Sequence, residues 1–159
     1  MPSTVSYHFS QRFVVSAQKA FEWCTDFDPN DHALMADSGA ERQIKRIDDR
    51  TIMLKDTFHA NGEKIEKKKL VELYPAQLMW TSTHLTGPNK YSQFHYQITS
   101  EDKDCSVLDF IGLHLDYKCK ENAELLADRL CKEDANAWKL LAKAMAKDIG
   151  KQKQRLLSS

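Results

Sequence analysis

The chain has 159 residues and an ordinary globular composition, in which 42% of the residues are apolar and 29% are charged. Lysine plus arginine number 23, as do aspartate plus glutamate, so the formal net charge is zero and gives no support for a nucleic-acid partner. This mixture is too apolar for disorder and too interrupted for stable membrane insertion, and it predicts a single soluble domain over residues 1–159.

The first predicted strand covers residues 5–15, where apolar side chains occupy every second position. Ser16 can cap a helix that follows, in which apolar residues recur at helical spacing until Asp28-Pro29. A second short helix is expected over residues 31–34. The chain therefore opens with one strand and two short helices.

Six strands in hairpin succession are predicted from Ala40 to Tyr117, because alternating runs are separated by turn signals. After Asn122 the pattern becomes helical, with a short helix through Leu125 and Leu130 and then a long one. The apolar stripe of the long helix consists of Trp138, Leu141, Met145, Ile149 and Leu156. A meander with one apolar face must cover that face, and the last helix is the only large cover available. The prediction is an α+β fold, a curved seven-stranded antiparallel sheet wrapped around the C-terminal helix.

Three segments resemble a known superfamily. They are Val14-Val15-Ser16-Ala17 leading into Ala20-Phe21-Glu22-Trp23, the strand turn from Leu73 to Trp80, and the terminal amphipathic helix. Together they resemble the START-like (SRPBCC) helix-grip superfamily, which includes polyketide cyclases and birch-pollen-allergen proteins, over nearly the whole chain. The resemblance implies a cavity between sheet and helix, generally used for apolar or amphipathic ligands. The superfamily has no shared catalytic motif, so it assigns no active residue.

Turn positions predict which polar residues face one another across the sheet. A type I′ turn at Asn61-Gly62 pairs Asp56 with Lys67, and a two-residue turn at Pro75-Ala76 pairs Lys67 with His84. This polar row can bind an anionic headgroup or move a proton. The alternative is a solvated salt bridge at an open end of the sheet.

A second row is predicted further along the sheet. A three-residue loop at 87–89 pairs Trp80 with Tyr96, and a turn around Asp102-Lys103 pairs Tyr96 with Asp109. Asp109 then interrupts an apolar run on the interior face. A buried carboxylate needs a hydrogen-bond donor, a proton or a polar ligand group, so Asp109 is the residue expected to orient a bound molecule.

The favoured function is binding or transport of an apolar or amphipathic, lipid-like small molecule. One alternative is an enzyme of the polyketide cyclase, dehydratase or hydrolase type, with Asp109 or His84 as acid or base. Another is a protein-interaction module of the stress-response, chaperone-activator type, using the outer sheet face or the basic end at 151–155. The expected ligand-binding residues are Phe58, Trp80, His84, Phe94, Tyr96, Asp109, Leu113, Trp138 and Met145, with Asp56 and Lys67 as the polar row.

No cofactor is expected, and no metal, because the histidines His8, His59, His95 and His114 fall on the polar phase of their strands without metal-ligand spacing. The four cysteines match neither a zinc nor a redox motif and are predicted to be free thiols. The N-terminus lacks the features of a signal peptide, so a cytoplasmic location is expected. The sequence leaves a homodimer open.

Overall fold

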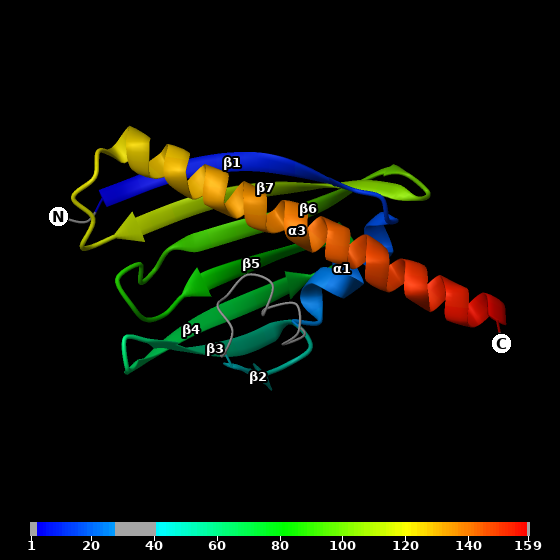
Figure 1. Cartoon of the computed structure of the whole chain (residues 1–159), viewed down its shortest axis with the longest axis horizontal. Coiled ribbons are helices and arrows are strands. Elements are labelled where there is room, and N and C mark those ends of the chain that lie inside the picture. The colour runs from blue at the N-terminus through cyan, green and yellow to red at the C-terminus, as the bar shows by residue number, and fades with distance from the viewer. Residues whose placement is uncertain (1–2, 28–40, 159) are drawn as a thin grey trace.

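The computed structural model describes residues 3–27 and 41–158. Its strands are β1 (Ser3–Phe13), β2 (Glu41–Arg46), β3 (Thr51–Ala60), β4 (Glu63–Tyr74), β5 (Met79–His84), β6 (Gln93–Asp102) and β7 (Cys105–Asp116). Within the described residues they form one seven-stranded sheet in the order β1-β7-β6-β5-β4-β3-β2, and every pairing is antiparallel. The meander from β2 to β7 is thus closed by β1, as predicted (Figure 1).

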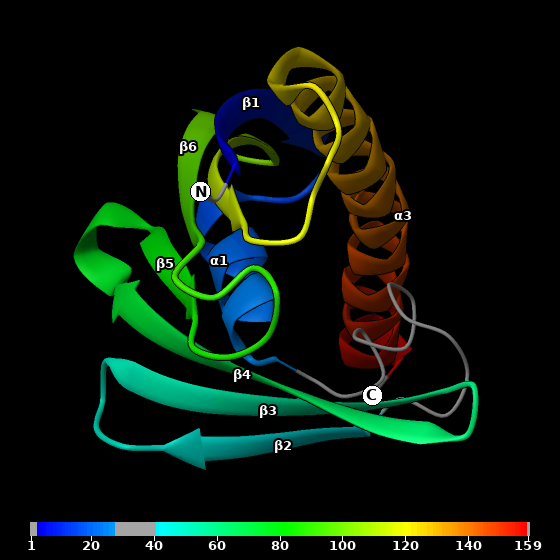
Figure 2. The ribbon, with the colours of Figure 1, turned by 90° about the vertical axis from the view of Figure 1, so that its left-hand side faces the viewer.

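Two helices lie on the sheet side that Figures 1 and 2 show as concave. Helix α1 (Ala17–Thr25) begins at the predicted cap, because the Ser16 side chain accepts a hydrogen bond of 3.4 Å from the Lys19 backbone N–H. The second short helix, expected over 31–34, lies outside the described residues. Helix α3 (Ala123–Ser158) crosses the sheet diagonally.

Helix α3 is one continuous helix of 36 residues, so the predicted separate helix through Leu125 and Leu130 is wrong. The first turns of α3 already pack on β1, and Leu126 is fully buried there. The predicted apolar stripe is buried through Ile149, but Leu156 is 77% exposed where the helix runs past the sheet. None of the helices described by the structure has a stretch long and apolar enough to span a bilayer.

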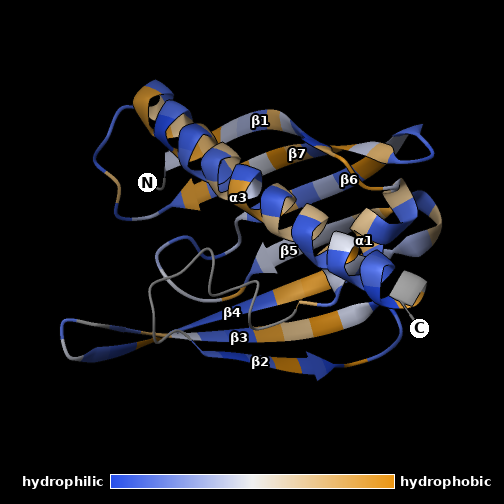
Figure 3. Ribbon diagram, turned by 45° about the vertical axis from the view of Figure 1, so that its right-hand side comes forward, coloured by the Kyte–Doolittle hydropathy of each residue, from blue (hydrophilic) through white to orange (hydrophobic). Residues whose placement is uncertain are grey.

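The main core fills the space between α1, α3 and the sheet. Its fully buried centre includes Ala20, Ile52, Val71, Leu108 and Met145, each with 0% of its surface exposed. Figure 3 shows that β3 and β4 are apolar toward α1 and hydrophilic toward the hairpin that joins them. The two strands therefore leave the apolar core at their hairpin end, where polar side chains take its place.

The β3–β4 register agrees with the prediction, since Asp56 lies opposite Lys67. The predicted β4–β5 register is wrong by two residues, and His84 lies opposite Lys69 instead of Lys67. Pro75–Gln77 forms a 3₁₀ turn (η1), and Leu78 follows with a φ of 53°, so four residues rather than two separate the strands. A shift of two keeps each side chain on its predicted face.

The predicted β6–β7 register is wrong by one residue, which reverses the faces of β7. The Asp102 carboxylate accepts a hydrogen bond of 2.8 Å from the Asp104 backbone N–H, so the turn begins later than predicted. A β-bulge between Ser100 and Asp102 then shifts the pairing back by one position. Tyr96 therefore faces Phe110, and Asp109 lies opposite Gln97.

This reversal removes two predicted interior residues from the concave face. Asp109 lies on the outer face, where its carboxylate accepts a hydrogen bond of 2.6 Å from the Ser10 hydroxyl. Leu113 is 43% exposed on the same face. His114, which was placed on the polar face, is instead interior and only 6% exposed.

Gly112 of β7 lies directly beneath the ring of Tyr7 on β1. A Cβ at Gly112 would lie 2.6 Å from Tyr7 Cζ, so Gly112→Ala forces the ring out of position. We expect this change to lower the free energy of unfolding by about 1–3 kcal/mol, the usual cost of overpacking. Urea denaturation measures it.

Gly150→Ala in α3 is the matched control, because a Cβ at this position would have no atom within 4 Å apart from its chain neighbours and the local helix backbone. We expect it to raise the free energy of unfolding by about 0.5–1 kcal/mol through higher helix propensity. A Gly112 variant as stable as wild type would contradict the close packing of Tyr7.

Candidate functional site

Two adjoining cavities lie between the sheet and α3. The narrow chamber has a volume of about 130 Å³ and the wide chamber about 460 Å³. Sites for small molecules typically occupy roughly 300–1,000 Å³, and the volume of the wide chamber by itself falls within that range. The chambers meet at the residues that line both, which are Arg42, Lys69, Ser82, Tyr96 and Trp138.

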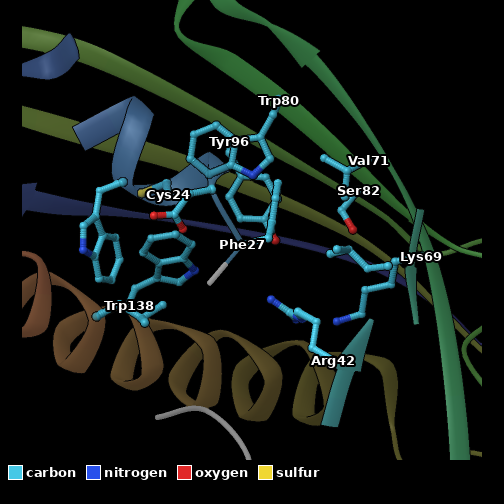
Figure 4. Close-up of a pocket in the computed structure, with 13 residues that line it drawn as sticks. Cys24, Phe27, Arg42, Lys69, Val71, Trp80, Ser82, Tyr96 and Trp138 are labelled. Atoms are coloured by element: carbon cyan, nitrogen blue, oxygen red, sulfur yellow. The ribbon is translucent and has the colours of Figure 1, made fainter. Parts of the chain in front are cut away.

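Aromatic rings form much of the narrow chamber's wall (Figure 4). Trp80 and Tyr96 lie opposite each other on β5 and β6, as predicted, with ring centroids 4.7 Å apart and planes only 3° from parallel. Trp138 of α3 approaches Tyr96 at a centroid distance of 5.8 Å. Such a wall offers a large apolar surface to the body of a ligand.

A buried ion-pair cluster lies where the two chambers meet. Asp56 is fully buried, and its carboxylate accepts hydrogen bonds of 2.7 Å from Arg42 Nε and 3.0 Å from an Arg42 terminal nitrogen. Lys69 Nζ lies 3.5 Å from the same carboxylate. Burial lowers the pKa of Lys69, and the Asp56 carboxylate opposes that shift. The cluster contains Asp56 of the predicted polar row, but Arg42 and Lys69 pair with it in place of Lys67 and His84, which line the wide chamber.

A hydrogen-bonded acid pair lines the wide chamber on the side of β1 and α3. The Tyr7 hydroxyl donates a 2.5 Å hydrogen bond to Asp134 Oδ2. Burial raises the pKa of Asp134, although the bond from Tyr7 acts in the opposite direction. Burial and the Asp134 charge together raise the pKa of Tyr7 far above its usual range. The pair places a strong hydrogen-bond donor and acceptor beside the cavity.

Two histidines and an asparagine form another polar part of the wide chamber. Burial, together with the Lys69 charge, lowers the pKa of His84 to about 4, so this imidazole is neutral at pH 7. His114 Nε2 and Asn89 Oδ1 are buried and have no hydrogen bond within the described residues. Asp116 Oδ2 lies 3.6 Å from His114 Nε2. Both atoms can bind a polar ligand group.

The lowered pKa of His84 predicts a loss of stability in mild acid. The unfolded state binds a proton at the ordinary pKa of 6.5, whereas folded His84 resists protonation down to about 4. The free energy of unfolding should therefore fall as the pH decreases through this window. The raised pKa of Asp134 has the opposite effect on the pH dependence of stability. The contribution of His84 is therefore isolated by comparing wild-type protein with His84→Gln, in which Asp134 is unchanged. Denaturation of both proteins at about pH 7 and about pH 4.5 should show a smaller loss for the variant; an equal loss would contradict the assignment.

The structure brings together most of the predicted ligand-binding residues. Those that line one or both chambers are Phe58, Lys67, Trp80, His84, Phe94, Tyr96 and Trp138. Their contact with a ligand stays a prediction. Met145 is fully buried in the core, and Asp109 and Leu113 lie on the outer face, so these three are placed away from the chambers.

Sequence reasoning did not select Tyr7, Arg42, His114 or Asp134 as site residues. Asp134 precedes Trp138 by one helical turn, and this spacing could have identified an acid on the inward stripe. Tyr7 was on the predicted interior phase of the first strand. His114 was missed because the one-residue register error placed it on the outer face of the sheet. No sequence signal linked Arg42 to Asp56.

No family model matches this chain, and no curated protein matches it by sequence. Solved structures do match. The Zhui aromatase/cyclase from Streptomyces sp. R1128 is 12% identical, with a TM-score of 0.68 over 96% of each chain. Norcoclaurine synthase from Thalictrum flavum, in complex with dopamine and hydroxybenzaldehyde, is 14% identical, with a TM-score of 0.67 over 94% of this chain and 88% of the other.

A START superfamily protein from Mycobacterium smegmatis is 15% identical, with a TM-score of 0.64 over 92% of this chain and 98% of the other. Identities this low show the fold alone. The chain has the START-like helix-grip fold, which confirms the resemblance drawn from the sequence.

Proposed function

We propose that this START-like chain binds an apolar or amphipathic small molecule in the two chambers between the sheet and α3. The observation that carries the proposal is the junction of an aromatic wall, the stacked Trp80 and Tyr96, with the ionic groups of Arg42 and Lys69. The apolar body of a ligand fits the aromatic wall, and a polar group of the same ligand fits the ionic groups. The solved complex of norcoclaurine synthase with dopamine and hydroxybenzaldehyde supports the proposal, because a protein of similar fold there binds small aromatic molecules.

Native mass spectrometry of the purified protein tests the proposal. We expect an adduct that is released by organic extraction and lost on denaturation. The extracted compound, added back to stripped protein, should quench tryptophan fluorescence, since Trp80 and Trp138 line the chambers. Absence of any adduct, together with no binding of apolar fluorescent probes, would refute the proposal.

A matched pair of variants on β5 locates the binding site. Ser82 is only 7% exposed and lines both chambers. Ser82→Phe should therefore fill the space where the chambers meet. Its neighbour Thr83 points to the opposite face, and Thr83→Phe should leave binding unchanged. Circular dichroism shows whether both variants fold. Equal binding by the two variants would move the site elsewhere.

A catalytic function is the second candidate, favoured by the hydrogen bond between Tyr7 and Asp134 beside neutral His84 in one chamber. Such groups can act as acid and base in cyclase- or hydrolase-type chemistry. The extracted compound distinguishes the candidates: an enzyme should change its mass on incubation, and Asp134→Asn should slow that change while binding persists. A compound recovered unchanged favours a carrier.

A further inference from the structure

The inward face of β4 changes from apolar to cationic along its length. Leu73 and Val71 are buried in the core, and the next two inward positions are Lys69 and Lys67, both of which line the wide chamber. Figure 3 shows the same change in hydropathy along the strand. A lysine on an inward face costs desolvation free energy unless it gains a partner, so two in succession require an explanation.

One of these lysines contacts a carboxylate, because Asp56 forms an ion pair with Lys69 and shares its oxygens with Arg42. Arg42 makes hydrogen bonds of 2.7 and 3.0 Å to Asp56, whereas Lys69 Nζ lies 3.5 Å from the same carboxylate. Lys67 Nζ lies 5.4 Å from the centre of the Phe58 ring. Within residues 3–27 and 41–158, no carboxylate comes within ion-pair distance of Lys67.

The carboxylates of the wide chamber are paired with other groups, while His114 offers a ring nitrogen without a hydrogen bond within the described residues. On α3, Asp134 accepts the hydrogen bond from Tyr7, and Glu133 forms an ion pair of 3.3 Å with Arg129. His84 is packed against the Phe94 ring at a centroid distance of 5.0 Å. The two lysine ammonium groups are therefore the charges best placed to meet a charged group of a ligand.

We propose that Lys67 and Lys69 bind the acidic group of the ligand, so that the site selects an organic anion, in which a carboxylate, sulfonate or similar acidic group is attached to an aromatic or other apolar body. The apolar body lies against Trp80, Tyr96 and Trp138, and the acidic group accepts charge-assisted hydrogen bonds from the two ammonium groups. This inference rests on the proposed function and adds the charge class of the ligand.

Two fluorescent probes with the same aromatic body test the inference. 1-Anilinonaphthalene-8-sulfonate carries an anionic group, and N-phenyl-1-naphthylamine lacks it. We expect Lys67→Met and Lys69→Met each to raise the Kd of the anionic probe about tenfold, as expected for loss of a charge-assisted hydrogen bond. The Kd of the neutral probe should change less than about twofold.

Lys68→Met is the matched control, because Lys68 lies between the two residues on the outward, exposed face of β4. It should leave the Kd of both probes unchanged. Ser82→Phe should abolish binding of both probes, which shows that they occupy the chambers. Thermal denaturation identifies any variant that does not fold. If Lys69→Met does not fold, Lys67→Met alone tests the anion assignment, because Lys67 lies nearer the exposed hairpin end of β4.

The outcomes separate the two proposals. If both probes bind and the lysine variants weaken them equally or not at all, the anion assignment is wrong while the binding function stands. If neither probe binds wild-type protein and no adduct is found by mass spectrometry, the proposed function itself is wrong. Selective loss of the anionic probe in both inward variants, but not in Lys68→Met, supports the assignment.

Discussion

Trp138→Ala is expected to lower the free energy of unfolding by about 3–5 kcal/mol, measured by chemical denaturation. Trp138 lies in the middle of α3 and is 8% exposed. Its ring meets Phe13 of β1 at a centroid distance of 6.2 Å and Tyr96 of β6 at 5.8 Å. Removing the ring therefore opens a cavity between the helix and two strands, and that cavity joins the existing chambers.

Leu140→Ala is the control for this prediction, since Leu140 lies two residues further along α3 and is 54% exposed. It should cost less than about 1 kcal/mol, because little surface is lost from the core. A Trp138→Ala cost of the same size would mean that the ring contributes to the chamber wall but not to the packing of α3 on the sheet.

Most of the fold could be predicted from the sequence because its signals are local. The Asn61-Gly62 turn fixes the β3–β4 register, and a two-residue error at Pro75–Gln77 still keeps the side chains of β5 on their predicted face. The single β-bulge before Asp102 had a larger effect, since a one-residue shift reversed all of β7. Bulges have no strong sequence signal, so this error is intrinsic to turn counting.

The candidate site was harder to predict because it is assembled from distant segments. Tyr7 and Asp134 are 127 residues apart, and their hydrogen bond depends on how α3 crosses β1. The aromatic wall could be predicted from the sequence because Trp80 and Tyr96 face each other across one hairpin. Pairing across one turn is predictable, whereas contact between helix and sheet needs the full packing arrangement.

Asp56→Ala is expected to lower the free energy of unfolding by about 3–5 kcal/mol, because it leaves buried cations without their carboxylate. Asp56 is fully buried, and Arg42 and Lys69 both contact it from inside the fold. Urea denaturation at neutral pH measures the loss. Glu66→Ala on β4 is the control: Glu66 pairs with Lys55 and Lys64 on the exposed surface, and its loss should change stability little.

A second substitution shows whether the loss comes from unpaired charge or from the cavity left by the side chain. Adding Arg42→Met to Asp56→Ala removes a cation that makes two hydrogen bonds to Asp56 in the wild-type protein. If unpaired charge is the cause, the double variant should regain part of the lost stability, since an apolar side chain needs no ionic partner. If stability falls further, the cost lies in packing. Stability equal to wild type in the single variant would show that Asp56 does not hold the cluster together, and that the cations at the chamber junction are positioned by their strands alone.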